Sequence, residues 1–357
     1  MIDAHVRKAF PGGRDSAPFE LDVELKSAAG VTVLFGPSGA GKSLTLDCIA
    51  GFVRPDEGRI LVNDRLLFDA GAAVNLPPRQ RRCGCVLPGE SLFPHMSLFA
   101  NLWFAAGRIP RRARRQKVGE MLERFHLEEL GARRPYELSS GQRQRGSIAR
   151  ALLSQPSVLL LDEPARGLDA ALRAEFYALL REVRAEFGVP VVLVTHDLDE
   201  ALELGESMHV LVAGKIAQSG APREIFDAPA SAAVARLLDC YNLLRAEIVA
   251  MDPASNRSRL HVTTGDGTEF DIVGPYFPGL LLGAKLTFAV REDEIEHGTE
   301  LPGGVQLELR RVVRLSRGVR VELSGGIRIA VAEAPGRGQS RLWSVRFRPQ
   351  SLRLVKA

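Results

Sequence analysis

A short loop in this sequence combines three glycines with a lysine and a serine, a set of residues suited to binding phosphate. Residues 36–43 follow an apolar run and open a stretch with helical character. Glycines let successive backbone N–H groups turn inward around phosphate oxygens, and the first turn of a helix adds its dipole. In this pattern Lys42 neutralises the β- and γ-phosphates and the Ser43 hydroxyl ligates Mg²⁺. We expect the ligand contacts to come from Gly36, Pro37, Ser38, Gly39, Ala40, Gly41, Lys42, Ser43 and Leu44.

Two further apolar runs end in residues that could act on a bound phosphate. Residues 158–161 lead into Asp162 and Glu163, and residues 191–194 lead into His196. The carboxyl ends of parallel strands meet at the ligand crevice of a sheet, so these side chains should gather at one edge. Asp162 would then complete the Mg²⁺ shell, and Glu163 would orient the attacking water. His196 is a candidate γ-phosphate contact, although a lone histidine is more often structural.

The order of the elements predicts two parts of different class. Short apolar runs alternate with helical stretches at 42–52, 112–125 and 170–187, which predicts an α/β core with a parallel sheet. After about residue 235 only short alternating strands follow, for example 246–249, 259–262, 269–273 and 285–290, which predicts a small β-barrel or sandwich. We therefore expect domains at 1–235 and 236–357. The second domain also looks doubled, over about 243–298 and 305–357, because FAVREDEIEH is echoed by VRFRPQSLRL.

Composition limits the cellular setting. The 357 residues are 45% hydrophobic, and no apolar run reaches the ~20 residues of a membrane-spanning helix, so a membrane role is expected to be peripheral. The cysteines Cys48, Cys83, Cys85 and Cys240 fit reduced thiols of a cytosolic protein, and the Cys83–Cys85 spacing matches no zinc pattern.

Two basic runs, 79–82 and 108–117, accompany a net charge of +4. Such runs could bind nucleic acid or anionic lipid headgroups. We interpret them instead as solvated surface, because no aromatic residues are interleaved as a platform for stacking bases. No nucleic-acid partner is expected.

The segment 138–145, LSSGQRQR, resembles the signature LSGGQ of the ATP-binding subunits of ABC transporters, with Ser140 in place of one glycine. The resemblance covers about residues 2–235. It implies a P-loop NTPase with a RecA-like core, a helical subdomain at about 88–155 and a small OB-like all-β C-terminal domain. It also implies ATP and Mg²⁺ as cofactors and a second copy of the chain as partner. In that dimer Ser139, Ser140, Gly141 and Gln142 would cap ATP bound to the other copy.

Three further positions follow from the same resemblance. Phe10 matches the adenine-stacking aromatic of the family, and Asp169 matches its dimer-contacting loop. Pro88 stands where the family has a glutamine that contacts Mg²⁺ and the attacking water, and a proline side chain can do neither. We therefore expect slow or poorly coupled hydrolysis, unless Glu90 substitutes for the glutamine.

Segments 66–69, 74–82 and 92–95 resemble the molybdate importer ATPases, with sulfate importers as the nearest competitor. This implies an ATPase at the cytoplasmic face of the bacterial inner membrane. It would bind integral membrane permease subunits through a groove near 92–104 and serve a periplasmic binding protein indirectly. The tail would bind an oxyanion or act as a scaffold. Two other classes remain open: a soluble ABC ATPase acting on nucleic acid or ribosomes, and a nucleotide-gated regulatory module with little turnover.

Overall fold

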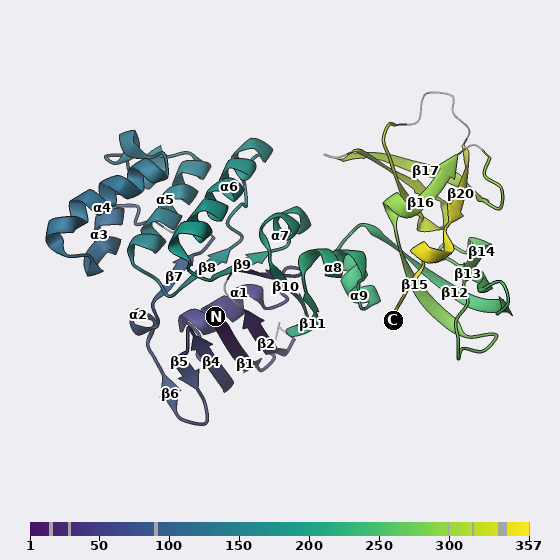
Figure 1. The fold of residues 1–357 in the computed structure, drawn as a ribbon, viewed down its shortest axis with the longest axis horizontal. Helices are drawn as coiled ribbons and strands as arrows, with labels where there is room; N and C mark the ends of the chain where they lie inside the picture. Colours follow the sequence, from purple (N-terminus) through teal and green to yellow (C-terminus); the bar gives the residue numbers. More distant parts are fainter. Residues whose placement is uncertain are drawn as a thin grey trace. The chain divides into compact units, whose positions relative to one another are not determined.

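The computed structural model describes residues 1–13, 17–27, 30–88, 92–298, 300–315, 318–334 and 341–356. The chain forms two compact units, Met1–Ile225 and Phe226–Ala357 (Figure 1). The first unit contains most of the helices and a large mixed sheet, and the second is built mainly of strands, with one short helix at Ala232–Leu237. The predicted fold class, an α/β core followed by an all-β tail, is confirmed.

One sheet of eleven strands organises the first unit, in the order β6-β5-β4-β1-β2-β11-β10-β3-β9-β8-β7. Its centre is parallel, and β3, β8 and β9 are buried along their whole length, as the apolar runs predict. The parallel strands are β10 (Ser207–Val212), β3 (Val31–Phe35), β9 (Val191–Thr195), β8 (Val158–Asp162) and β7 (Cys83–Val86). The other strands are β1 (Ile2–Phe10), β2 (Phe19–Ser27), β4 (Glu57–Val62), β5 (Arg65–Asp69), β6 (Val74–Asn75) and β11 (Lys215–Gly220).

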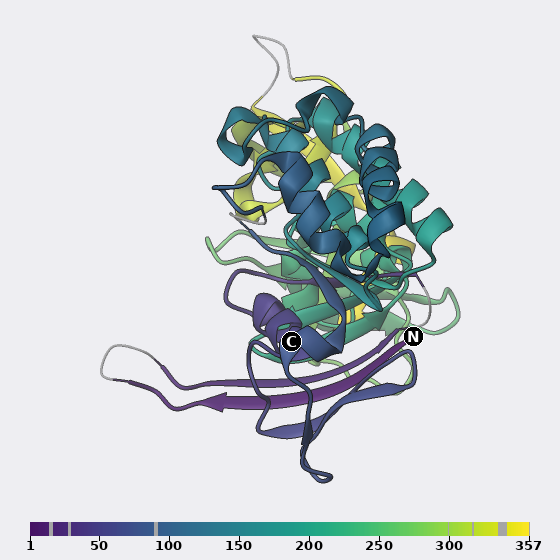
Figure 2. The ribbon, with the colours of Figure 1, turned by 90° about the vertical axis from the view of Figure 1, so that its left-hand side faces the viewer.

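Helices cover this sheet and form a separate cluster beside it (Figures 1 and 2). The short α1 (Lys42–Ala50) follows β3 and packs on the sheet, where Leu46, Ile49 and Ala50 enter the core. The helical cluster consists of α3 (Leu98–Ala105), the 3₁₀ turn η1 (Ala106–Arg108), α4 (Arg111–Arg124) and α5 (Ser140–Leu153). The remaining helices are α2 (Pro78–Arg81), α6 (Ala170–Phe187), α7 (Leu198–Leu204), α8 (Pro222–Asp227) and α9 (Ala232–Leu237).

The second unit contains two five-stranded sheets around one core. Their orders are β14-β13-β12-β15-β21 and β16-β20-β17-β18-β19. Phe270 of the first sheet stacks on Phe347 of the second, with ring centroids 5.9 Å apart. The strands are β12 (Tyr241–Asp252), β13 (Arg257–Thr263), β14 (Glu269–Pro275), β15 (Lys285–Arg291), β16 (Ile295–Gly298), β17 (Val305–Leu315), β18 (Gly318–Leu323), β19 (Arg328–Val331), β20 (Leu342–Phe347) and β21 (Arg353–Val355).

The two similar sequences, FAVREDEIEH and VRFRPQSLRL, form the same local structure. In each of them the chain passes from one sheet of the tail to the other. A 3₁₀ turn, η4 (Glu292–Glu294), separates β15 from β16, and another, η6 (Pro349–Ser351), separates β20 from β21. In each case the chain crosses from one sheet to the other at this turn. The division at Ile225 lies before the one expected at 235, because α9 belongs with the tail: the Ala232 N–H donates to the Lys356 carbonyl at 2.8 Å.

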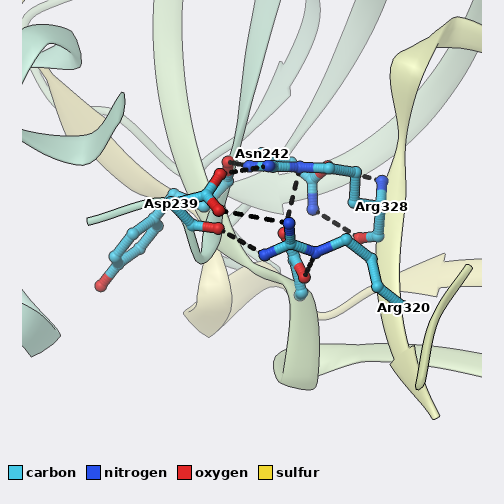
Figure 3. A network of polar contacts seen from close by, with 6 residues as sticks. Asp239, Asn242, Arg320 and Arg328 are labelled. Carbon is cyan, nitrogen blue, oxygen red and sulfur yellow. Dashed lines mark hydrogen bonds and ion pairs between the residues drawn. The ribbon is translucent and has the colours of Figure 1, made fainter. Parts of the chain in front are cut away.

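An ion-pair network ties the second tail sheet to the segment that follows α9 (Figure 3). Glu292 is buried, and its carboxylate lies 2.8 Å from Arg320 Nε and 3.0 Å from Arg328 Nε. The same two arginines reach Asp239, at 3.2 and 2.7 Å. Asn242 exchanges two hydrogen bonds with the backbone of Arg328. Burial still raises the pKa of Glu292, so the two arginines offset only part of the cost of desolvating its carboxylate.

Candidate nucleotide-binding site

The loop between β3 and α1 has a conformation that only glycine accepts at two of its positions. Gly41 has a φ of 101°, in the left-handed region, and a Cβ there would lie 2.6 Å from Leu21 Cδ1. A Cβ at Gly36 would lie 2.3 Å from the Leu211 carbonyl oxygen. The glycines therefore let the loop pass close to the neighbouring strands and leave its N–H groups free of side-chain bulk.

Lys42 is held inside this loop. Its side chain is buried, and Nζ donates to the carbonyls of Gly36 at 2.7 Å and Pro37 at 2.9 Å. Burial lowers the pKa of Lys42, and the nearby Glu163 and Asp162 oppose that shift. Because both bonded partners are neutral carbonyls, the charge of the ammonium group remains for an anionic ligand.

Asp162 and Ser43 form a pair of oxygen donors suited to Mg²⁺. Asp162 is the last residue of β8 and is buried, and the nearby Ser43 hydroxyl acts to lower the pKa of its carboxyl group. Within the described ranges, Asp162 Oδ1 is buried without a hydrogen-bond partner. Burial raises the pKa of Asp162. A buried carboxylate oxygen without a partner beside a hydroxyl fits a hard cation that prefers oxygen ligands.

Glu163 and His196 meet at the same edge of the sheet. Glu163 follows β8 with a φ of 46°, and its N–H donates to the Val194 carbonyl of β9 at 2.9 Å. One carboxylate oxygen lies 2.9 Å from His196 Nδ1, and the other accepts from Arg166 Nη1 at 3.0 Å. The Glu163 side chain is 15% exposed, so it is oriented by its partners yet open to a ligand. This arrangement can hold a water molecule and accept its proton.

Of these groups, Lys42, Ser43 and Glu163 line one cavity of about 410 Å³, and Asp162 and His196 are not among its lining residues. Its lining residues are Phe19, Ser38, Gly39, Gly41, Lys42, Ser43, Leu44 and Glu163. Phe19 was not expected, and Phe10 is not among the lining residues. The two phenylalanines lie opposite each other in the β1–β2 pairing, so they face the same side of the sheet. Adenine stacking on Phe10 therefore stays a prediction. Phe19 could have been found from the alternation of apolar residues along β2.

The signature segment lies at the start of α5 and lines no part of this cavity among the described residues. Ser139 is the N-cap of the helix: its hydroxyl accepts from the Gln142 N–H at 3.2 Å, and Gln142 Oε1 accepts from the Ser139 N–H at 2.9 Å. Ser140 is exposed and Gly141 is buried. Asp169 caps α6 by accepting from the Leu172 N–H at 2.9 Å. Contacts of these residues with a second copy stay a prediction.

Comparisons with known proteins agree with this geometry. A family described as "ABC transporter" matches residues 21–166. The molybdenum import ATP-binding protein ModC of Paramagnetospirillum magneticum is 35% identical over 307 residues, which are 86% of this chain and 81% of that protein. This chain belongs to the ABC transporter ATPases. The spermidine/putrescine import ATP-binding protein PotA of Frankia alni is 38% identical over 288 residues, which are 79% of this chain and 61% of that protein.

A solved structure shares the fold of the ABC ATPase unit. It is the dimeric structure of a post-hydrolysis state of an ATP-binding cassette bound to ADP and Pi, with a TM-score of 0.53 and 27% sequence identity. The match covers 62% of this chain and 99% of that chain. Within the described part of the present ABC ATPase, the helices are too short or too polar to cross a membrane.

Pro88 lies at the same sheet edge as the carboxylates of this ABC ATPase. The parallel pairing of β7 with β8 aligns Val86 with Leu161, and Pro88 follows two residues later and is exposed. Glu90, the expected substitute for the missing glutamine, lies outside the described residues.

The basic run 79–82 is not entirely surface, so that interpretation was wrong for Arg81, which is 1% exposed. Its guanidinium donates to the carbonyls of Cys48 at 2.7 Å and Ile49 at 3.0 Å, near the C-terminus of α1. It also donates to Asn75 Oδ1 at 2.7 Å. A cation at this end of the helix satisfies carbonyls that lack intrahelical partners. Arg81 thus anchors the helix that follows the phosphate loop to the segment leading into β7.

Glu200 is a buried carboxyl group close to Glu163. It lies in the first turn of α7, which Asp197 caps, and is 2% exposed. Burial raises the pKa of Glu200 to about 7, with Asp197 and Glu163 adding to the shift and the Thr195 hydroxyl and Arg173 opposing it. The neighbouring Tyr177 is also buried, and burial raises its pKa.

Replacing the Glu163 carboxylate should affect ATP hydrolysis and ATP binding differently. We predict that Glu163→Gln lowers the rate of ATP hydrolysis by roughly 100-fold or more, because the amide cannot accept a proton, while ATP affinity changes little. Phosphate release and equilibrium nucleotide binding would be measured on the full chain. Glu175→Gln, an exposed site on α6, is the matched control and should keep the parent rate. Equal hydrolysis by Glu163→Gln and the control would exclude the role given to Glu163.

The raised pKa of Glu200 predicts a pH-dependent stability. The folded protein keeps a proton that the unfolded chain loses near pH 4.5, so this group's contribution to stability falls as the pH rises toward about 7. Glu200→Gln cannot ionise and should gain up to about 3 kcal/mol of unfolding free energy relative to the parent over that interval. Urea unfolding of both proteins from acidic to neutral pH tests this. Curves that remain parallel across the interval would contradict the assignment.

Proposed function

We propose that the protein is the ATP-hydrolysing subunit of an importer. The observation that carries the proposal is the buried Oδ1 of Asp162, which has no hydrogen-bond partner among the described residues. It lies near Ser43, which lines the same cavity as Lys42 and Glu163. The loop N–H groups and Lys42 would bind the β- and γ-phosphates, and Ser43 and Asp162 would hold Mg²⁺, which neutralises charge on the phosphates. Glu163 would take the proton of the attacking water. His196 would orient Glu163 and contact the γ-phosphate.

A second copy of the chain would complete the site. The cavity carries no group from the signature segment within the described residues, although that segment starts a helix and presents an exposed Ser139 and Ser140. The first-turn N–H groups of α5 and the Ser139 hydroxyl, which can still donate its proton, are suited to a terminal phosphate. In a head-to-tail dimer each copy would supply these groups to the other, and Asp169 would lie near the contact.

The partner in the membrane would be a permease that docks on α3. Leu98 and Leu102, expected in the docking groove, have no exposed surface and belong to the core. The exposed part of this region is Phe104, 61% exposed, whose ring meets the edge of Phe93 with centroids 5.3 Å apart. The half-exposed Phe99 and Trp103 stack beside it. This aromatic surface would place the protein at the cytoplasmic face of the membrane and link it indirectly to a periplasmic binding protein.

Molybdate is the proposed substrate. The support is the resemblance of segments 66–69, 74–82 and 92–95 to the molybdate importer ATPases, together with a relative named as a molybdenum import protein. A relative of similar identity is named as a spermidine/putrescine import protein. Sulfate is the nearest alternative substrate from the sequence resemblance.

Uptake by cells that lack the protein tests the function and its substrate together. We predict that molybdate uptake is lost and is restored by the parent chain, but not by Glu163→Gln, because the imported ion moves only when ATP is turned over. Sulfate and spermidine uptake should be unchanged. Loss of sulfate or spermidine uptake in place of molybdate uptake would contradict the proposed substrate. Normal uptake of all three would contradict the proposal that the protein serves an importer.

Pro88 predicts slow ATP hydrolysis. Slow hydrolysis would also favour the alternative function, a nucleotide-gated regulatory module. We predict that Pro88→Gln raises the rate of ATP hydrolysis by roughly tenfold or more, because the amide can orient water beside Glu163. Phosphate release is compared with that of the parent and of Pro253→Gln, an exposed proline in the tail. A rate equal to that of the parent would contradict the expectation that Pro88 slows hydrolysis.

A further inference from the structure

Arg108 at the end of η1 and three arginines in the first turns of α4 form an exposed cationic surface, and none of the four makes an ion pair with another described residue. This basic surface consists of Arg108, Arg111, Arg112 and Arg115, all of them exposed. Salt bridges elsewhere in the described ranges include many arginines, but none involves these four. Other cations of the same segment are engaged: Lys117 pairs with Glu120 at 2.7 Å, and Arg114 lies 5.3 Å from the centre of the Trp103 ring. The surface is therefore a distinct local feature.

The position of these arginines is unfavourable for the helix itself. The N-cap residue of α4 is Pro110, which offers no side-chain cap, and the first turn has no acidic residue. Cations near the positive end of a helix dipole are destabilising. The four arginines are also three or four residues apart in several pairs, a spacing at which like charges repel. When residues disfavour the helix that contains them and no contact offsets that cost, the position is often a functional site.

We propose that the basic surface binds the anionic phospholipid headgroups of the membrane that holds the transport partner. The proposal rests on the proposed function for the nearness of that membrane. It also rests on continuity: η1 joins α4 directly to α3, which carries the exposed Phe104, and Arg114 packs on Trp103 of the same helix. Guanidinium groups match phosphate oxygens in a bidentate geometry, and an anionic leaflet supplies many phosphates at once.

A nucleic acid is the less favoured occupant of this surface. Base stacking needs free aromatic faces between the cations. Trp103 is the aromatic residue that packs on this segment, and its ring already contacts Arg114 and stacks with Phe99, the two ring centroids lying 6.0 Å apart. The chemistry of the surface is thus positive charge without a stacking platform.

Vesicle binding by the full chain tests the proposal. The probes are phosphatidylcholine vesicles with and without about a third phosphatidylglycerol, in a co-sedimentation assay at physiological salt. The test variant combines Arg111→Glu, Arg112→Glu and Arg115→Glu. The matched control combines Arg310→Glu, Arg311→Glu and Arg314→Glu on β17, which are exposed and change the net charge by the same amount. The test variant should fold, because it places acidic residues where the helix dipole favours them, and circular dichroism verifies this.

The parent and the control should bind the anionic vesicles, and the test variant should bind roughly 100-fold more weakly, at about fivefold per arginine. Neutral vesicles should bind none of the three. The proposal is overturned if the parent does not prefer anionic vesicles, if both variants lose binding equally, or if single-stranded DNA binds the parent more tightly than the vesicles do. ATP hydrolysis is measured on the same samples. Absence of hydrolysis in all of them would count against the proposed function, independently of the vesicle result.

Discussion

The parallel pairing of β3, β9 and β8 is the constraint on which the rest of the first unit depends. The register aligns Phe35 with Thr195 and Asp162 with Val194, so the strands end together at one edge of the sheet. The phosphate loop, the carboxylates and the histidine each follow one of these ends. Their convergence comes from backbone hydrogen bonding and burial of the strands, and no contact among the polar groups is needed to create it. The site can therefore keep a buried oxygen of Asp162 free for a ligand.

A single copy of the chain builds a site that is open on one side. Lys42, Ser43 and Glu163 line one cavity, while the signature segment uses its polar groups to cap its own helix. In the proposed mechanism, nucleotide binding and association of two copies are one event, since each copy completes the other's site. Such coupling would convert a chemical step into a change of shape that a membrane partner can follow. Pro88 lies at the sheet edge where the membrane partner would respond to the nucleotide. We therefore expect it to affect the coupling of ATP hydrolysis to that partner more than the binding of ATP.

Elements whose features are local in sequence could be predicted, and contacts made across the fold could not. The buried strands and α6 follow from apolar runs and from helical periodicity, and the capping of α5 follows from the serine and glutamine three residues apart. Arg81 appeared to be part of a basic surface, because its role depends on carbonyls more than 30 residues away. Leu98 and Leu102 appeared to be docking residues, because apolar character alone does not distinguish core from surface. The side of the sheet that Phe19 faces follows from the apolar alternation along β2, whereas the exchange of β16 and β21 between the tail sheets depends on strand pairing that the sequence does not specify.

The central claim is that two copies of the chain enclose the triphosphate between them. The most direct measurement is the mass in solution of the Glu163→Gln protein with saturating ATP and Mg²⁺, determined by light scattering. The account predicts a dimer that depends on ATP, and a monomer when Ser139 is replaced by a bulky residue such as arginine in the same background. A monomer at saturating ATP, with nucleotide bound, would contradict it.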